Sequence, residues 1–213
     1  MLGKLTSLKT LILSWTKVRN ISALAKLKNL ETLELSETNV MKISALAQLT
    51  KLGRLYLNES NVINISGLFE LTKLERLSLS GTKVCDIYAL RKLSKLKTLE
   101  LNVTNVCDIS VLEYLTNLKQ LFLFMTNVKN ISALAKLTKL EVLSLDRTKV
   151  ADISAMAMLT KLERLDLDRT KVENIAALEN LTSLKWLCLS GTKVSDADIS
   201  GLKHKLNLVV HRK

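Results

Sequence analysis

The residue types that most often carry acid–base or metal chemistry are scarce in this sequence of 213 residues. Its two histidines, His204 and His211, both lie among the last ten residues, and its three cysteines are Cys85, Cys107 and Cys188. No GxGxxG, phosphate loop, CxxC or HExxH motif is present. The sequence therefore predicts no enzyme, no cofactor, no catalytic residue and no metal ligand.

Two local groups of side chains remain as candidates for binding. Asp166 and Asp168 are separated by one residue, with Asp146 lying 20 residues before Asp166, and Phe122 and Phe124 are also separated by one residue. Carboxylates of this kind can form a catalytic pair when a deep pocket shields them from water. Whether the two groups meet depends on the elements that position them.

Those elements repeat every 22 residues. Nine units begin at a leucine and cover residues 5–202, with four residues before them and eleven after. Positions 1, 4, 7 and 9 of each unit are leucine, and position 14 is valine. One unit cannot bury its leucines alone, so the units must stack and share one continuous core. The first residues of the units are Leu5, Leu27, Leu49, Leu71, Leu93, Leu115, Leu137, Leu159 and Leu181.

Each unit contains two periodicities. Alternation around positions 7 and 9 predicts a short strand with one buried face. Spacing of three between positions 14, 17 and 20 predicts a short helical or 3₁₀ segment, and an Asn or Asp at position 16 can cap it. Stacked strands pair in parallel at about 4.8 Å per unit. Helical segments are wider than strands, so the strands line the concave side of an arc.

The pattern LxxLxxLxLxxTxVxxIxxLxx resembles the leucine-rich repeat family, in the 22-residue class of bacterial internalins and the regulatory subunit of protein phosphatase 1. The resemblance implies an α/β solenoid, with a parallel β-sheet on the concave face and 3₁₀ segments on the convex face. Threonine stands at position 12 where that class usually has asparagine, so a ladder of Thr hydroxyls is expected between units. We interpret residues 1–213 as a single domain, with residues 195–213 as a C-terminal cap and no N-terminal cap.

The resemblance also implies a non-enzymatic protein-interaction module that binds a protein or peptide on its concave face. Positions 6, 8, 10 and 11 should point out from that face, and five of the eight aromatic residues fall there. Exposed aromatic side chains are enriched in protein contacts, although aromatics also simply favour strands. The predicted contact residues are Tyr56, Phe122, Phe124, Met125, Asp146, Arg147, Arg164, Asp166, Asp168, Arg169 and Trp186.

The charged members of this set have two interpretations. Asp146, Asp166 and Asp168 could form cross-strand ion pairs with Arg147, Arg164 and Arg169, or the six could provide a polar rim for a ligand. Across the four columns there are five arginines and seven carboxylates, so the net charge of +12 must lie elsewhere.

Two lysine columns carry that charge. They are Lys51, Lys73, Lys95, Lys139 and Lys161 at position 3, and Lys17, Lys83, Lys149, Lys171 and Lys193 at position 13. Such flanks could bind nucleic acid or another polyanion through counterion release. However, aromatic residues do not alternate with these lysines, so we expect a solvated surface and consider nucleic acid unlikely. A third possibility is a structural segment of a larger scaffold or receptor.

Other expectations concern the surroundings of the protein. Its apolar runs are too short to span a membrane, and its first residues lack a signal core, which favours a cytoplasmic location. Cys85 and Cys107 share position 15 of adjacent units and are expected to be reduced thiols, whereas Cys188 on the concave face is a candidate reactive thiol. The expected state is a monomer or a dimer weakly paired through the edge strand.

Overall fold

The computed structural model of the protein describes residues 5–206 and 208–212, and within them each unit contributes one three-residue strand. The strand covers positions 6–8, with the central leucine pointing into the core. The strands are β1 (Thr10–Ile12), β2 (Thr32–Glu34), β3 (Arg54–Tyr56), β4 (Arg76–Ser78), β5 (Thr98–Glu100), β6 (Gln120–Phe122), β7 (Val142–Ser144), β8 (Arg164–Asp166) and β9 (Trp186–Cys188), followed by β10 (Val209–His211).

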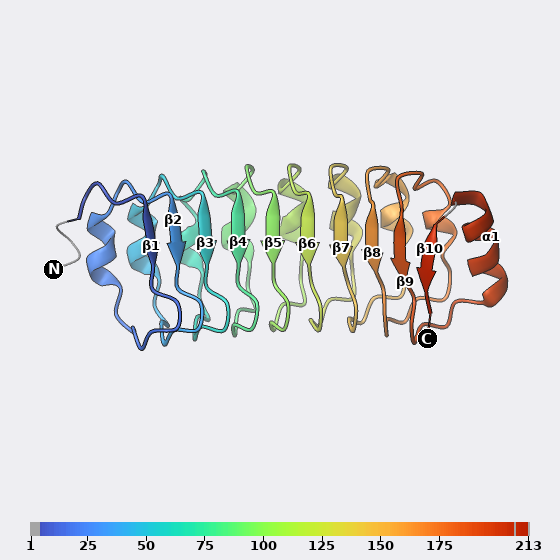
Figure 1. Cartoon of the computed structure of the whole chain (residues 1–213), viewed down its shortest axis with the longest axis horizontal. Coiled ribbons are helices and arrows are strands. Elements are labelled where there is room, and N and C mark those ends of the chain that lie inside the picture. Colours follow the sequence, from blue (N-terminus) through green and yellow to red (C-terminus); the bar gives the residue numbers. More distant parts are fainter. Residues whose placement is uncertain (1–4, 207, 213) are drawn as a thin grey trace.

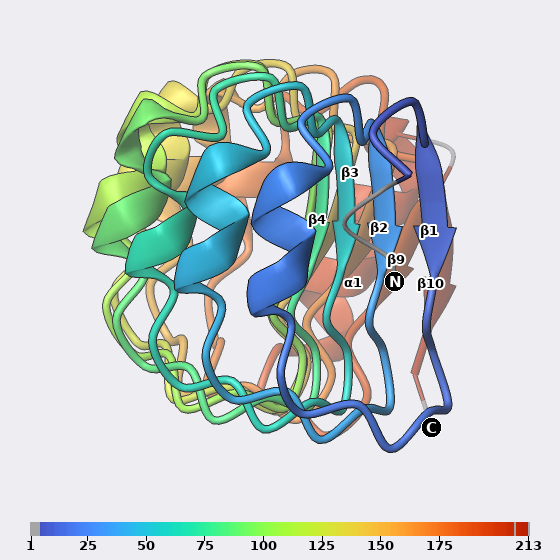
Figure 2. The ribbon, with the colours of Figure 1, turned by 90° about the vertical axis from the view of Figure 1, so that its left-hand side faces the viewer.

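All ten strands form one parallel sheet in sequential order (Figure 1). Residues 22 apart face each other from β1 to β9, as in the pair Leu33 and Leu55. Figure 2 shows the sheet on one side and the helical turns on the other, with β1 and β10 displaced outward from the middle strands. The sheet therefore lines the concave side, as the repeat predicted.

The helical layer consists of 3₁₀ turns at positions 18–22 or 18–20. The turns are η2 (Ser22–Lys26), η3 (Ser44–Gln48), η4 (Ser66–Leu68), η5 (Tyr88–Lys92), η6 (Ser110–Tyr114), η7 (Ser132–Lys136), η8 (Ser154–Met158) and η9 (Ala176–Leu178). They begin one residue after the isoleucine at position 17, so the predicted helical segment started too early. Apart from the partly buried Val18, positions 14 and 17 are buried in the extended loop that precedes each turn.

The polar residue at position 16 caps these turns. In seven units its side-chain oxygen accepts the backbone N–H of position 18, as Asn20 does from Ser22 at 2.9 Å. This bond satisfies one N–H that the start of a short helix leaves free. The capping role predicted from the sequence is thus confirmed in these units.

The threonines at position 12 do not form the expected ladder between units. Each hydroxyl instead donates to the carbonyl of position 9 in its own unit, as Thr82 does to Leu79 at 2.6 Å, and Ser60 does the same. Side chains at position 10 bridge neighbouring units in three places, where Asn58, Asn102 and Asp168 accept the next unit's N–H. Position 10, and not position 12, therefore supplies these bonds between units.

The leucine columns form one core along the whole solenoid. From the second unit onward the leucines at positions 1, 4, 7 and 9 are almost fully buried, whereas Leu5, on the first unit, is 49% exposed. At the other end, α1 (Asp196–Leu206) packs Ile199 and Leu202 against the last unit. This helix within residues 195–213 was not predicted from the sequence.

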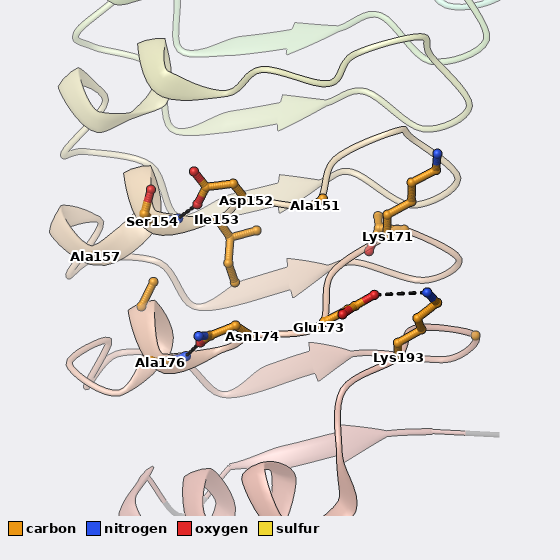
Figure 3. Close-up of a pocket in the computed structure, with 13 residues that line it drawn as sticks. Ala151, Asp152, Ile153, Ser154, Ala157, Lys171, Glu173, Asn174, Ala176 and Lys193 are labelled. Atoms are coloured by element: carbon orange, nitrogen blue, oxygen red, sulfur yellow. Dashed lines mark hydrogen bonds and ion pairs between the residues drawn. The ribbon is translucent and has the colours of Figure 1, made fainter.

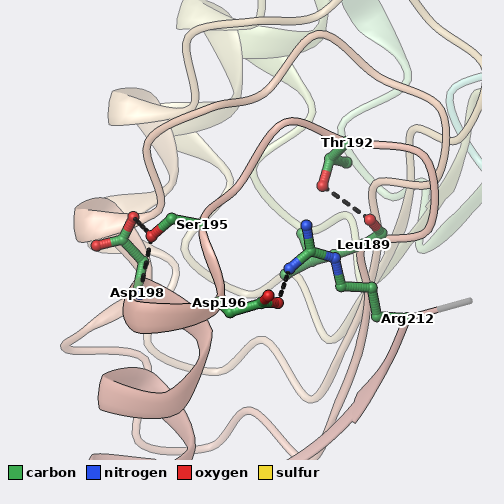
Figure 4. A network of polar contacts seen from close by, with 6 residues as sticks. All are labelled: Leu189, Thr192, Ser195, Asp196, Asp198 and Arg212. Carbon is green, nitrogen blue, oxygen red and sulfur yellow. Dashed lines mark hydrogen bonds and ion pairs between the residues drawn. The ribbon is translucent and has the colours of Figure 1, made fainter.

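A polar network holds the start of α1 (Figure 4). The Ser195 hydroxyl accepts the Asp198 N–H at 3.1 Å and donates to its carboxylate at 2.6 Å, so that Ser195 caps the N-terminus of the helix. Arg212, just after β10, forms an ion pair with Asp196. The last helix and the last strand are thereby tied together.

Candidate functional site

We call the outward face of the sheet, at positions 6, 8, 10 and 11, the concave surface. Position 11 has a left-handed backbone in all nine units, and only Gly81 and Gly191 are glycines there. A side chain at Gly81 would meet the Glu59 carboxylate, because a Cβ would lie 2.1 Å from its Oε1. This conformation turns the side chains of Val103 and Met125 outward, so that they are 46% and 51% exposed.

The apolar residues predicted around the sixth unit lie together on this surface. Phe122 ends β6, and Phe124 and Met125 follow it within three residues. Both phenylalanines are half-buried, and the Phe124 N–H donates to Asn102 Oδ1 of the preceding unit at 2.9 Å. With Val103 they form the apolar centre, which is the name used below for these four residues.

Tyr56 and Trp186 are not part of the apolar centre. Tyr56 lies on β3, with β4 and β5 between it and β6, and Trp186 lies on β9. Trp186 instead packs within the protein: the Arg164 guanidinium is 4.0 Å from its ring centroid, and the His211 ring is 5.4 Å away. Part of the Trp186 ring surface is therefore already covered by Arg164 and His211 in the free protein.

The predicted ion pairs between aspartates and arginines do not form. Within the described part of the chain, all eight ion pairs lie elsewhere, and none includes Asp146, Asp166 or Asp168. Arg147 lies over the Phe124 ring at 5.6 Å, and Arg169 is exposed with its Cγ beside Gly191. The cross-strand ion-pair interpretation is therefore wrong, and these side chains retain groups that face solvent.

Each of the three aspartate carboxylates accepts a hydrogen bond from its own unit or from the next one. Asp146 accepts the Ser144 hydroxyl at 2.7 Å, Asp166 accepts the Asp168 N–H at 3.2 Å, and Asp168 accepts the Ser190 N–H at 2.6 Å. Burial raises the pKa of Asp166 to about 6, and the neighbouring charges of Asp146 and Asp168 contribute to the increase. The pKa of Asp146 is raised for the same main reason.

Cys188 does not have the environment of a reactive thiol. It is 8% exposed, and burial together with the carboxylates of Asp168 and Asp166 raises its pKa to about 11. The thiol and the two carboxylates lie within 4.8 Å of one another, but Asp168 is already engaged with Ser190. Because the thiolate is the nucleophilic form, the prediction of a reactive Cys188 was wrong.

Some positions expected to be accessible are buried. Ser78 and Thr98 are 0% and 5% exposed, because larger neighbours on adjacent strands cover them. Ser78 donates to the Glu100 carboxylate at 2.7 Å, and Thr98 donates to Gln120 at 3.3 Å. The concave surface is therefore more closely packed at β4 and β5 than the alternation alone indicates.

A row of ion pairs beside the sheet was missed in the sequence. Position 5 is Lys or Glu in eight of the nine units, and residues of opposite charge in neighbouring units form four pairs at 2.7–3.1 Å. The signal was available, because residues 22 apart are neighbours in the stack. The pairs are Lys9–Glu31, Lys97–Glu75, Lys119–Glu141 and Lys185–Glu163.

A cavity of about 990 Å³ lies outside the concave surface (Figure 3). It is formed by the loops and 3₁₀ turns of the seventh to ninth units, where Ala151, Ala157 and Ala176 leave space. Several of its polar groups have partners within the chain: Asp152 and Asn174 cap the turns, and Glu173 pairs with Lys193 at 3.0 Å. No ligand chemistry is indicated by this cavity.

The parallel sheet, the 3₁₀ layer and the stacked leucines define a leucine-rich repeat solenoid. The chain belongs to the leucine-rich repeat family: the leucine-rich repeat region family matches residues 1–131, and the family of two-copy leucine-rich repeats matches residues 116–157. A comparison with curated proteins gave no match.

Several solved structures are similar to this chain. Internalin C2 from Listeria monocytogenes is 29% identical with a TM-score of 0.81, over 96% of this chain and 80% of that one. Internalin inlF from the same species is 27% identical with a TM-score of 0.73, over 99% of this chain and 77% of that one. The Arabidopsis receptor kinase HAESA, solved with the peptide hormone IDA and the co-receptor SERK1, is 26% identical with a TM-score of 0.79. That match covers 91% of this chain but only 36% of the receptor chain.

Among the described residues, none of the helices has the length and apolar character needed to cross a membrane.

Proposed function

We propose that this chain is a protein-interaction module that binds a protein or peptide segment on its concave surface. The apolar centre carries the proposal, because Val103 and Met125 present aliphatic side chains to solvent beside two half-buried phenylalanine rings. Such a cluster, near the middle of a rigid sheet, is suited to act as the anchor of an interface. The four residues of the apolar centre are not part of the buried leucine core.

Backbone conformation supports the same proposal. Val103 is β-branched and has a φ of 55°, in a column where Gly81 and Gly191 show that glycine fits. A β-branched residue in this region costs on the order of 1 kcal/mol or more relative to glycine. Because 46% of Val103 remains exposed, packing within the chain recovers little of that cost. A contact between Val103 and a bound partner would offset the remaining backbone cost.

The charged residues beside the apolar centre would orient the bound partner. Arg147, Arg164 and Arg169 make no ion pair within residues 5–206 and 208–212, and the half-buried carboxylates of Asp146, Asp166 and Asp168 lie on the same units. A partner can therefore meet both signs of charge beside an apolar anchor. HAESA, with its bound peptide hormone, is a similar solenoid that acts in this class of recognition. The cytoplasmic location and the monomeric or weakly edge-paired state remain predictions, as does the single-domain interpretation of residues 1–213.

Affinity capture from a lysate of the source organism tests this function. The wild type, the Phe122→Ala/Phe124→Ala variant and the Tyr114→Ala control serve as baits, at physiological and at several-fold higher salt. Tyr114 is 56% exposed on η6, away from the concave surface. A protein that the wild type and the control retain at high salt, and the double variant loses, supports the proposal. If the double variant unfolds, or retains the same proteins, the apolar centre is not the binding site.

The second candidate is a polyanion or an anionic surface bound by the lysine flanks. Lys17, Lys83, Lys149 and Lys171 make no ion pair among the described residues, whereas Lys193 pairs with Glu173. Binding of this kind weakens steeply with salt and equally for both baits, because it depends on counterion release. Loss of binding on Lys73→Glu with Lys95→Glu distinguishes it from concave-surface binding.

A further inference from the structure

A second exposed apolar surface lies in the loops that connect each strand to its 3₁₀ turn. Position 15 is apolar in four consecutive units, and it is bracketed by the cations Arg19 and Lys129. Met41 and Ile63 are 58% and 53% exposed, and both cysteines of the column are exposed and free. We call this column the flank strip; its members are Met41, Ile63, Cys85 and Cys107.

Aromatic residues extend the flank strip onto the helical layer. Tyr88 stands at position 18, which is serine or alanine in the other seven 3₁₀ turns, and it is 59% exposed. Phe69 occupies position 21, which is alanine in four units. The Arg91 guanidinium lies 4.1 Å from the Tyr88 ring and 4.7 Å from the Phe69 ring, and the Lys92 ammonium is 4.0 Å from Phe69. These departures from the repeat gather on adjacent units.

The flank strip is hollowed between its side chains. A cavity of about 590 Å³ is lined by Ile63, Phe69, Cys85 and Tyr88, and a second of about 680 Å³ by Arg19, Met41, Lys42, Ile63 and Lys83. Ile63 lines both, so the two cavities lie next to each other across neighbouring units, and together they are called the trough below. In the seventh and eighth units, position 15 is Ala151 or Glu173, and no such apolar column forms there (Figure 3).

The charge around this trough is positive. Arg19, Lys42 and Lys83 line it and make no ion pair within the described residues. The one carboxylate among the lining residues, Asp86, accepts the Tyr88 N–H at 2.8 Å. An occupant should therefore combine an apolar face with acidic margins, because the cations would otherwise lose hydration without gaining a partner.

The spacing of the trough fits a helix. Stacked units repeat at about 4.8 Å, and successive turns of an α-helix rise by about 5.4 Å. A helix along the solenoid axis can therefore offer one apolar side chain to each of Met41, Ile63 and Cys85 in turn. The apolar side chains of the flank strip are poor partners for the bases or phosphates of nucleic acid, which argues for a protein segment as the ligand.

We propose that the flank strip is a second binding site, and that its ligand is an acidic amphipathic helix of a partner protein. The site is separate from the concave surface and does not depend on the function proposed for that surface. Two faces of one solenoid would then hold two different segments, either of one partner or of two.

A designed peptide tests the proposal directly. The probe has about 18 residues, with leucines at i, i+4, i+7, i+11 and i+14 and glutamates on both margins of the apolar face. A matched peptide carries lysine in place of every glutamate. Fluorescence anisotropy should show binding of the acidic peptide and at least tenfold weaker binding of the basic one. Equal affinity for the two peptides would overturn the proposal.

Variants then locate the peptide. Ile63→Ala with Tyr88→Ser introduces residues that the repeat already uses, as in Ala151 and Ser66, so the fold should be retained. We expect about tenfold weaker binding by this variant and unchanged binding by the control Met158→Ala, whose residue is 64% exposed outside the flank strip. Loss of the peptide in Phe122→Ala/Phe124→Ala, with retention in the flank variant, would place it on the concave surface and contradict this inference.

A footprint on the unmodified protein needs no variant. Bound acidic peptide should slow the alkylation of Cys85 by iodoacetamide several-fold, as followed by mass spectrometry, while the buried Cys188 reacts slowly throughout. Unchanged Cys85 kinetics at saturating peptide would exclude the site. Vesicles containing phosphatidylserine form the last arm: flank-dependent binding of vesicles without binding of the peptide would assign the strip to a membrane surface and reject the helix.

Discussion

Arg164 and Trp186 face each other in register on β8 and β9, and the guanidinium lies 4.0 Å from the ring centroid. Both residues were predicted to contact a ligand, yet in the free protein they contact each other. A stacked guanidinium is held in one orientation while its N–H groups remain available at the edge. The pair therefore fixes the Arg164 guanidinium in place on the sheet, and under the proposed function its N–H groups would donate to the partner.

Replacing Arg164 should measure that stacking. Arg164→Thr introduces the residue found at the same position in β1, β2 and β5, and should lower the free energy of unfolding by about 0.5–1 kcal/mol in urea titrations. Arg76→Thr is the matched change, since Arg76 faces Arg54 across β3 and β4. Removing that like-charge pair should leave stability unchanged or raise it by a few tenths of a kcal/mol. Equal losses in both variants would show that stacking on Trp186 contributes nothing.

Asp168 has a structural hydrogen bond that asparagine can replace. Its Oδ1 accepts the Ser190 N–H at 2.6 Å, and Asn58 and Asn102 make the equivalent bond to Ser80 and Phe124 in other units. Asp168→Asn should therefore keep the free energy of unfolding, whereas Asp168→Ala should lower it by about 1–2 kcal/mol. Thermal unfolding at neutral pH distinguishes the two. A large loss in the asparagine variant would mean that the charge, and not the acceptor, is what the site requires.

The repeat made most of the architecture predictable, because every residue has a neighbour 22 positions away. The buried leucines, the concave sheet and the caps such as Asn20 follow from that rule alone. The same rule also places Lys97 beside Glu75 at position 5 and Arg164 beside Trp186 at position 6, so both contacts were predictable from the sequence. Periodicity does not predict how far the side chains of neighbouring units cover a given residue, and so how exposed that residue is.

Two residues show where this coverage by neighbours matters. Ser78 and Cys188 alternate with buried leucines and so should face solvent, but they are 0% and 8% exposed because longer side chains on adjacent strands close over them. The left-handed backbone at position 11 was equally hidden: Gly81 hints at it, whereas Val103 argues against it. Such features depend on the particular side chains around a site and not on the repeat.

Asp166 should make stability depend on pH with a sign opposite to that of most surface carboxylates. Its pKa is raised from 3.8 to about 6, mainly by burial and further by Asp146 and Asp168. Below pH 3.8 both the folded and the unfolded states hold the proton, and the group costs nothing. As the pH rises from there to about 6, the unfolded state releases its proton first, so folding is disfavoured; above about 6 the penalty is complete.

Asp166→Asn should therefore stabilise the protein at pH 8, by about 1 kcal/mol once partial exposure to solvent is allowed for, and the gain should vanish near pH 4. The amide oxygen can still accept the Asp168 N–H. Urea unfolding of both proteins from pH 4 to pH 8 gives the difference. Asp152→Asn is the control with the opposite sign, because the Ser154 N–H lowers the pKa of Asp152 and its carboxylate stabilises the folded state at neutral pH. A pH-independent difference between the wild type and Asp166→Asn would show that Asp166 is not the titrating group.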